Sequence, residues 1–313
     1  MFKRCRLETQ INNYKQPEVI NSTQQQQTEE NTTETPSKYP YNHFERLNKR
    51  SRWQTNKRAG KFYKELNKNY IDQEGSVQWI LNGEFRFDEE RLLIAAQDQG
   101  LMTNGFKKMC GIQENDKCRF CHTAVESSNH LISGCQTLLA DGHYTKRHNK
   151  VCSYIHWTIC KEYQIPTKEV RDHQPEPITA KDKITIFYDK NIPTGRYIES
   201  NAIKPDIVIR NQEDSTAIII DVSVPNDFGI NRAERDKITK YQDLKNALKE
   251  EWELKSIDVI PVIVGATGLM KDNLQLYLDA IPGKPKKYQI QVAAIRGTVS
   301  LLKRCLGSSF KHS

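Results

Sequence analysis

Apolar and polar positions follow two different periods along this chain, and each period predicts a different kind of element. Between residues 76 and 109, apolar side chains recur at helical spacing, most clearly in FDEERLLIAAQDQGLMTNGFKKM. A second helical pattern is HYTKRHNKVCSYIHWTICKEY. From Ile184 onward, strand-like runs alternate with helical ones. This order predicts a helical first part followed by an α/β (α+β) domain built as a small sandwich.

A β-hairpin is predicted over residues 204–225, KPDIVIRNQEDSTAIIIDVSVP, where two β-branched runs flank a polar turn. A turn centred between Glu213 and Asp214 sets Asp206 directly opposite Asp221. Carboxylates in opposed positions repel each other. A divalent cation such as Mg²⁺ or Mn²⁺ between them removes the repulsion, because hard cations prefer oxygen ligands. The alternative is a pair of strand-end aspartates in solvent.

The residues after the hairpin predict a helix, a strand and two more helices. The first helix is NRAERDKITKYQDLKNALKEEWEL. The run IDVIPVIVG has no polar alternation, which predicts a buried, central strand. Helices are expected at KDNLQLYLDAI and QVAAIRGTVSLLKRCL. The buried stripe of the first helix is predicted to comprise Ile238, Tyr241, Leu244, Leu248 and Trp252.

A positive charge beside the two aspartates is expected from that first helix. Many metal-dependent nucleases place a lysine two residues after the second carboxylate of such a hairpin, and here that position is Ser223. Lys237 and Lys240 lie at the edge of the apolar stripe, so either ammonium can reach the hairpin if the helix packs on it. Lys237 is favoured over Lys240. The alternative for each is a solvated lysine on a charged helix.

The most specific short motif is a set of possible metal ligands in CRFCHTAVESSNHLISGC. Cys118, Cys121, His130 and Cys135 supply three thiolates and one imidazole, which complete the tetrahedral shell of a structural Zn²⁺. His122 is a competitor for His130, but it adjoins Cys121 and would strain the shell. Two further cysteines and three histidines in the next helical run are expected to be core or surface residues without chemistry: Cys152, Cys160, His143, His148 and His156.

Composition points to a polyanionic partner. The chain has 313 residues and a net charge of +8. Residues 1–40 are polar and low in complexity, which predicts a disordered tail, and residues 41–75 form a basic segment dotted with aromatics. Basic side chains can neutralise phosphates and aromatic ones can stack on bases; the alternative is a solvated basic helix. The candidate nucleic-acid contacts are Arg50, Arg52, Trp53, Lys57, Arg58, Lys61, Lys146 and Arg147.

The remaining sequence signals set the expected domains and location. A proline-rich joint, DHQPEPIT, separates a helical region with the zinc motif, residues 76–165, from the last domain, residues 166–313. No apolar run is long enough to span a membrane, and MFKRCRLETQ lacks the apolar core of a secretory signal. Eight cysteines in such a chain are expected to be reduced thiols or metal ligands.

Two signatures, in order, resemble the C-terminal part of non-LTR retrotransposon polyproteins. Lys204-Pro205-Asp206 followed by Asp221 is similar to the signature of their restriction-like endonuclease. The CCHC spacing is similar to the zinc knuckle that precedes this nuclease. The phrases AAQDQGLMTN, HQPEP, ITKYQDLKNAL and VIPVIVGATG also resemble such polyproteins, and the resemblance covers residues 76–305.

The resemblance implies a three-layer restriction-endonuclease-like domain that nicks target DNA in the nucleus, where the new 3′-hydroxyl primes reverse transcription. It implies that Asp206 and Asp221 hold Mg²⁺, that Lys237 or Lys240 assists the attacking water, and that Tyr241 supports the site. Lys204 belongs to the same signature. DNA, and as a second candidate the element's RNA, is the implied partner.

The sequence also departs from this family. No reverse transcriptase catalytic box is present, so we expect no polymerase activity and a truncated, degenerate or host-adopted element. A zinc-containing nucleic-acid binder without catalysis is the alternative. A weaker alternative is an α/β protein with structural zinc and no nucleic-acid role.

Overall fold

The computed structural model describes residues 60–195, 198 and 203–307. The helices are α3 (Lys61–Leu66), α4 (Gln73–Leu81), α5 (Phe87–Gln97), α6 (Asn104–Met109), the π-helix η1 (His130–Gly134), α7 (Gln136–Ala140), α8 (His143–Glu162), the 3₁₀-helix η2 (Asp227–Gly229), α9 (Ile230–Lys240), α10 (Gln242–Glu251), α11 (Leu274–Asp279) and α12 (Lys287–Leu306). The strands are β1 (Ile178–Lys181), β2 (Ile184–Tyr188), β3 (Ile207–Asn211), β4 (Thr216–Ser223) and β5 (Ser256–Ile263).

Several predictions about the N-terminal part lie outside the described residues. They concern the disordered tail, residues 1–40, and most of the basic segment. The candidate nucleic-acid contacts in this part are Arg50, Arg52, Trp53, Lys57 and Arg58.

The strands form one open sheet in the order β1-β2-β3-β4-β5. The first three junctions are antiparallel, while β4 and β5 run parallel and are joined through α9 and α10. The β3–β4 hairpin pairs Ile207 with Ile220 and Asn211 with Thr216. This is the register expected from the turn, so the predicted hairpin is confirmed, as is a fold that combines helices with a mixed sheet.

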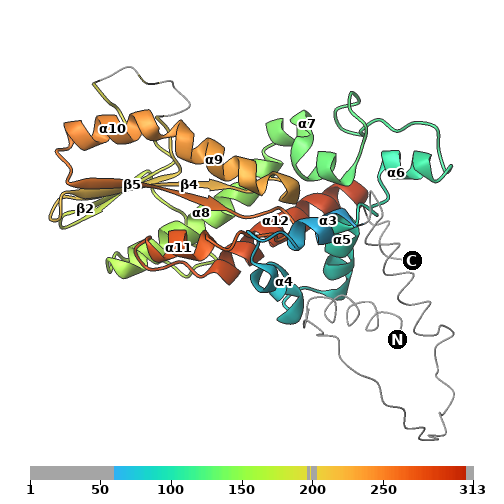
Figure 1. Ribbon diagram of the computed structural model, residues 1–313, viewed down its shortest axis with the longest axis horizontal. Helices are drawn as coiled ribbons and strands as arrows, with labels where there is room; N and C mark the ends of the chain where they lie inside the picture. The colour runs from blue at the N-terminus through green and yellow to red at the C-terminus, as the bar shows by residue number, and fades with distance from the viewer. Residues whose placement is uncertain (1–59, 196–197, 199–202, 308–313) are drawn as a thin grey trace, which may run out of the picture. The chain divides into compact units, whose positions relative to one another are not determined.

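Helices cover both faces of the sheet. Figure 1 shows α9 and α10 on one face and α8 and α11 on the other. Because neighbouring residues of a strand point to opposite faces, Val208 and Ile219 pack with Leu244 of α10. Ile207 and Ile220 pack in a second core that includes residues of α8 and α12. Strands β3 and β4 are therefore covered on both faces.

The predicted central position of the last strand is wrong. Among the strands in the described residues, β5 pairs with β4 alone and lies at the end of the sheet. Its residues Ile260, Val262 and Ile263 are nevertheless buried, because α9, α10 and α11 pack against this strand. An uninterrupted apolar run thus indicates that helices cover both faces of the strand. It does not indicate whether the strand has neighbours on both of its edges.

The predicted single helix from Asn231 to Leu254 is divided in two at Tyr241. This residue ends α9 and begins α10, with a φ of −101° and a ψ of 11°. Its side chain is completely buried, and its hydroxyl donates a hydrogen bond to Asp221 Oδ1 at 2.5 Å. The predicted inner stripe is buried at Tyr241, Leu244 and Leu248. The break therefore lies where a helix residue contacts the sheet's carboxylate.

Helices α8 and α12 pack against each other and join the two predicted domains through one core. Gly297 of α12 permits this approach, because a Cβ there would lie 2.5 Å from Arg147 Cγ. Both helices have 20 residues, yet among the described helices none is long and apolar enough to cross a membrane.

The predicted contact of Arg147 with phosphate is incompatible with its place in this core. Its side chain is 3% exposed. The guanidinium donates to the backbone oxygens of Ile132 and Val224, at 3.0 and 2.9 Å, and to Thr298 Oγ1 at 3.1 Å. Burial lowers the pKa of Arg147 to about 10. The sequence shows that this residue is charged, but it does not show which carbonyl groups accept hydrogen bonds from the guanidinium.

We expect Arg147→Ala to destabilise the fold without acting through nucleic acid. The substitution leaves three buried acceptors without their donor, which costs about 3 kcal/mol. Urea unfolding followed by circular dichroism measures this loss. Lys146→Ala, which changes the exposed neighbour, is the matched control and should shift stability by less than about 0.5 kcal/mol. Equal stabilities of the two variants would contradict the assignment.

Candidate metal and catalytic sites

The hairpin brings Asp206 and Asp221 to the same end of the sheet. Asp206 immediately precedes β3, and Asp221 lies next to Ile220 in β4. The pairing of Ile207 with Ile220 makes Asp206 and Asp221 the next opposed pair. The backbone N–H of Val222 donates to Asp206 Oδ2 at 2.6 Å, which holds this carboxylate beside β4. The register therefore places the two aspartates predicted to form one site at the same end of the hairpin.

Asp221 is held in a buried pocket by residues of α9 and the α9–α10 break. Its side chain is 3% exposed, and Lys237 forms an ion pair with Oδ2. The Tyr241 hydroxyl donates a hydrogen bond to Oδ1. Burial raises the pKa of Asp221, and the nearby charge of Asp206 raises it further. A positive charge close to this carboxylate is needed to keep it ionised.

The two helix lysines have different partners. Lys237 contacts Asp221 directly, whereas the Lys240 ammonium donates to the Tyr241 hydroxyl at 2.8 Å. Burial lowers the pKa of Lys240. The geometry thus favours Lys237 as the cation next to Asp221. Lys240 is linked to this carboxylate through the Tyr241 hydroxyl.

Lys204 is paired with a third aspartate. Its ammonium forms an ion pair with Asp189 Oδ1 at 2.8 Å, and its backbone oxygen lies 3.3 Å from the Tyr241 hydroxyl. The Asp189 N–H donates to the backbone oxygen of Asp206 at 2.8 Å. Lys204 and Asp189 therefore anchor the chain that enters β3.

His148 is a site residue that the sequence did not identify. It projects from α8, and its Nε2 lies 3.1 Å from Asp206 Oδ2 and 3.2 Å from the Val222 backbone oxygen. Burial opposes the charged imidazole, but the hydrogen bond to Asp206, the negative charge of that carboxylate and smaller effects of Asn149 and Asp221 together outweigh it and raise the pKa of His148 to about 9. Residues 148 and 206 are far apart in sequence, so only the packing of α8 under the sheet reveals this pair.

The residues around Asp206 and Asp221 fit a hard divalent cation. Among the described residues, the Lys237 ammonium contacts the buried Asp221 Oδ2, and the Tyr241 hydroxyl donates to Oδ1. Asp206 accepts through Oδ2 in the hydrogen bonds that it forms with His148 and Val222. A carboxylate oxygen has more than one lone pair, so these contacts leave acceptor capacity on both side chains, and carboxylate oxygens are the protein ligands that Mg²⁺ and Mn²⁺ prefer.

The four predicted zinc ligands converge on one point. Cys118, Cys121, His130 and Cys135 offer ligand atoms that all lie within 4.8 Å of one another. The sulfurs of Cys118 and Cys135 are 3.9 Å apart, and Cys121 Sγ is 3.4 Å from His130 Nε2. These separations match the edges of a tetrahedron with zinc bond lengths of about 2.3 Å to sulfur and about 2.0 Å to nitrogen. The cluster could therefore hold a metal ion such as zinc.

Three side chains, Glu126, Arg119 and Tyr144, support this cluster from outside. Glu126 is completely buried and accepts from the Arg119 guanidinium at 2.7 and 2.9 Å. Arg119 also donates to the backbone oxygen of Cys305 in α12 at 2.9 Å. The Tyr144 hydroxyl of α8 bridges the ligand-bearing turn, since it lies 2.9 Å from Leu131 O and accepts from the Cys135 N–H at 3.1 Å. The knuckle is thereby fixed to both long helices.

The other described residues predicted to contact nucleic acid are on the surface. Lys61 begins α3 and Lys146 lies in the first turn of α8, and both are exposed. Neither is near a charged partner that would neutralise it among the residues described. Their positions are compatible with contact to a polyanion.

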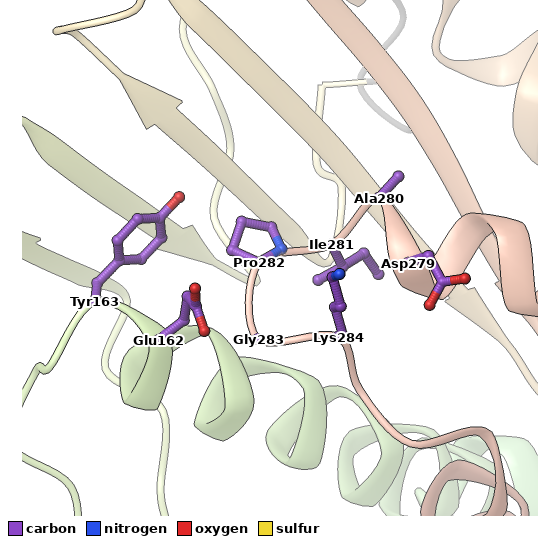
Figure 2. A pocket seen from close by; sticks show the side chains of 8 residues that line it. All are labelled: Glu162, Tyr163, Asp279, Ala280, Ile281, Pro282, Gly283 and Lys284. Atoms are coloured by element: carbon purple, nitrogen blue, oxygen red, sulfur yellow. The ribbon is translucent and has the colours of Figure 1, made fainter.

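A hollow in the described part of the chain lies away from the carboxylate site. Figure 2 shows this hollow, of about 410 Å³, between the end of α8 and the loop after α11. It is lined by Glu162, Tyr163, Asp279, Ala280, Ile281, Pro282, Gly283 and Lys284. Gly283, with a φ of 81°, lies so close to α8 that a Cβ would be 2.3 Å from the Thr158 backbone oxygen. The hollow is a gap between α8 and the loop after α11, and none of the predicted catalytic residues lines it.

Comparisons with known proteins add no family to this description. No protein-family profile matches the chain, and no curated protein matches it. The sites are therefore interpreted from their own residues.

Proposed function

We propose that the chain is a metal-dependent DNA endonuclease of the restriction-like kind found in non-LTR retrotransposons. One observation carries the proposal: the hairpin register opposes Asp206, just before β3, and Asp221, near the end of β4, and Lys237 and Tyr241 contact Asp221. Two carboxylates can hold a divalent cation for metal-assisted phosphodiester hydrolysis, and an ammonium beside them can stabilise developing negative charge.

Each residue of the site has a defined task in this proposal. Asp206 and Asp221 would hold Mg²⁺ or Mn²⁺, which when bound polarises a phosphoryl oxygen and lowers the pKa of water. The Lys237 ammonium orients the attacking water and stabilises developing negative charge. Tyr241 fixes Asp221, and Lys240 holds Tyr241. His148, bonded to Asp206, positions that carboxylate from the opposite face of the sheet.

The remainder of the chain would bind the substrate. Structural zinc at the CCHC cluster would order the knuckle, and exposed Lys61 and Lys146 together with the basic segment before residue 60 would neutralise phosphates. DNA is the proposed partner, with the element's RNA as a second candidate, and the nucleus is the proposed location. Because the sequence contains no polymerase box, the proposed chemistry is limited to hydrolysis.

One observation favours a second candidate, a nucleic-acid binder without catalysis. Ser223 stands where the simple nuclease pattern has its lysine. The Lys237–Asp221 contact opposes this alternative, because it supplies the missing charge from α9.

Nicking of supercoiled plasmid tests the choice between these functions. The full chain is expected to relax plasmid with Mg²⁺ and not with EDTA, and Asp206→Ala is expected to remove this activity. Binding of the same DNA, measured at two salt concentrations, accompanies the assay. Binding that weakens with salt, without any metal-dependent relaxation, would replace the endonuclease with the binder.

A further inference from the structure

Helix α8 carries a regular stripe of possible metal ligands on the side that faces the sheet. His148, Cys152, His156 and Cys160 follow one another at intervals of four residues, which aligns them along one helix face. The first half of the stripe reaches Asp206 through His148. The second half, His156 and Cys160, lies two turns farther along α8 and plays no part in the proposed nuclease.

His173 joins this second half from the proline-rich segment that follows α8. His156 Nδ1 lies 2.9 Å from His173 Nε2 and 3.5 Å from Cys160 Sγ. All three ligand atoms lie within 4.8 Å of one another. His156 and Cys160 are each 1% exposed, while His173 is partly exposed. Two imidazoles and a thiol thus converge at the edge of the core.

The separations in this trio resemble those in the CCHC cluster. A nitrogen and a sulfur bound to one tetrahedral zinc ion are about 3.5 Å apart, given zinc bond lengths of about 2.0 and 2.3 Å. Cys160 and His156 have this separation, and Cys121 and His130 are 3.4 Å apart. The i,i+4 spacing on α8 brings the thiol to the imidazole, as it also does for Cys152 and His148 at 3.6 Å, and His173 supplies the third ligand atom within the same 4.8 Å.

A simple hydrogen bond between the histidines is the main alternative. It accounts for the distance of 2.9 Å between the ring nitrogens. It gives no role to the Cys160 thiol, which faces the same His156 nitrogen.

We propose that His156, Cys160 and His173 form a second zinc site with three protein ligands and one position open to solvent. Imidazole and thiolate together suit a borderline cation such as Zn²⁺, and binding releases the Cys160 proton to solvent. The partly exposed His173 leaves room for a water molecule at the fourth position, as in other three-ligand zinc sites.

The site would fasten the segment after α8 to the helix. Two hydrogen bonds already act in this direction, since Ser153 Oγ donates to the His173 backbone oxygen and Trp157 Nε1 donates to the Lys168 backbone oxygen, each at 3.0 Å. His156 also packs edge-on against Tyr188 of β2, with ring centroids 5.4 Å apart. A metal there would tie α8, the proline-rich segment and the sheet together.

Metal content of the purified full chain tests the site. After loading with Zn²⁺ and dialysis, elemental mass spectrometry is expected to find at least two equivalents in the wild type. His173→Ala and Cys160→Ser should each hold one equivalent fewer. Cys121→Ser should also lose one equivalent, while the matched control His143→Ala, which changes a histidine outside the stripe, should lose none.

Two results keep this test separate from folding and from nuclease activity. Circular dichroism of each variant identifies unfolded protein, and His173→Ala is the least disruptive because His173 is partly exposed. When folded His173→Ala is loaded with Co²⁺ in place of zinc, its absorption spectrum should lack the bands of the proposed second site and keep those of the CCHC cluster. A folded His173→Ala chain with the wild-type zinc content would overturn the proposal, whatever the plasmid assay shows.

Discussion

Asp221→Asn is expected to lower the rate of metal-dependent DNA nicking about 10³-fold. The substitution keeps the shape of the side chain and its bond to Tyr241 but removes the negative charge that a divalent cation requires. Metal-ion catalysis contributes several kcal/mol to such a reaction, and about 1.4 kcal/mol corresponds to each tenfold in rate. Single-turnover nicking at saturating Mg²⁺ measures the loss.

The control for this prediction is Asp258→Asn, which changes an exposed aspartate of β5 in the same sheet. It should nick at the wild-type rate. The folded Asp221→Asn protein should keep its affinity for DNA, because Asp221 is buried away from the surface. Wild-type nicking by Asp221→Asn would separate the activity from this carboxylate and contradict the proposed site.

Removal of zinc from the CCHC cluster is the second large effect that we expect. Residues 116–135 contain the four ligands but little regular structure besides η1, and structural zinc in small knuckles contributes about 10 kcal/mol or more to folding. A strong chelator, or Cys118→Ser, should therefore abolish amide hydrogen-exchange protection in this segment. Protection of the β3–β4 hairpin should remain, because it lies in a different part of the core.

Cys110→Ser provides the matched control for the chelation experiment. Cys110 is an exposed free cysteine outside the cluster, so its loss should change neither zinc content nor protection. If residues 116–135 stay protected in the presence of chelator, then Arg119, Glu126 and Tyr144 suffice to hold the loop and zinc is dispensable for its fold.

The parts of the site that depend on local sequence could be predicted. The turn between the two β-branched runs was enough to pair Ile207 with Ile220, and this pairing opposes the aspartates. The spacing of the CCHC motif was enough to identify the ligands that converge. In both cases the chain between the interacting residues is short, so few alternative arrangements compete.

The parts that depend on packing between distant elements could not be predicted. His148 and Asp206 meet only because α8 lies under the sheet. Arg147 has the sequence character of a surface cation, and its burial follows from carbonyl groups of η1 and the segment after β4. The helix break at Tyr241 has the same origin, since the buried Asp221 carboxylate accepts the Tyr241 hydroxyl.

Helix α8 also fixes the distance between the knuckle and the carboxylate site. Tyr144 holds the ligand-bearing turn of the knuckle, and His148, four residues later, holds Asp206. At a rise of about 1.5 Å per residue, these two contacts are about 6 Å apart along the axis of one helix. One residue inserted between Tyr144 and His148 would rotate their side chains by about 100° relative to each other. The length of this helical segment therefore fixes the distance between the zinc knuckle and Asp206.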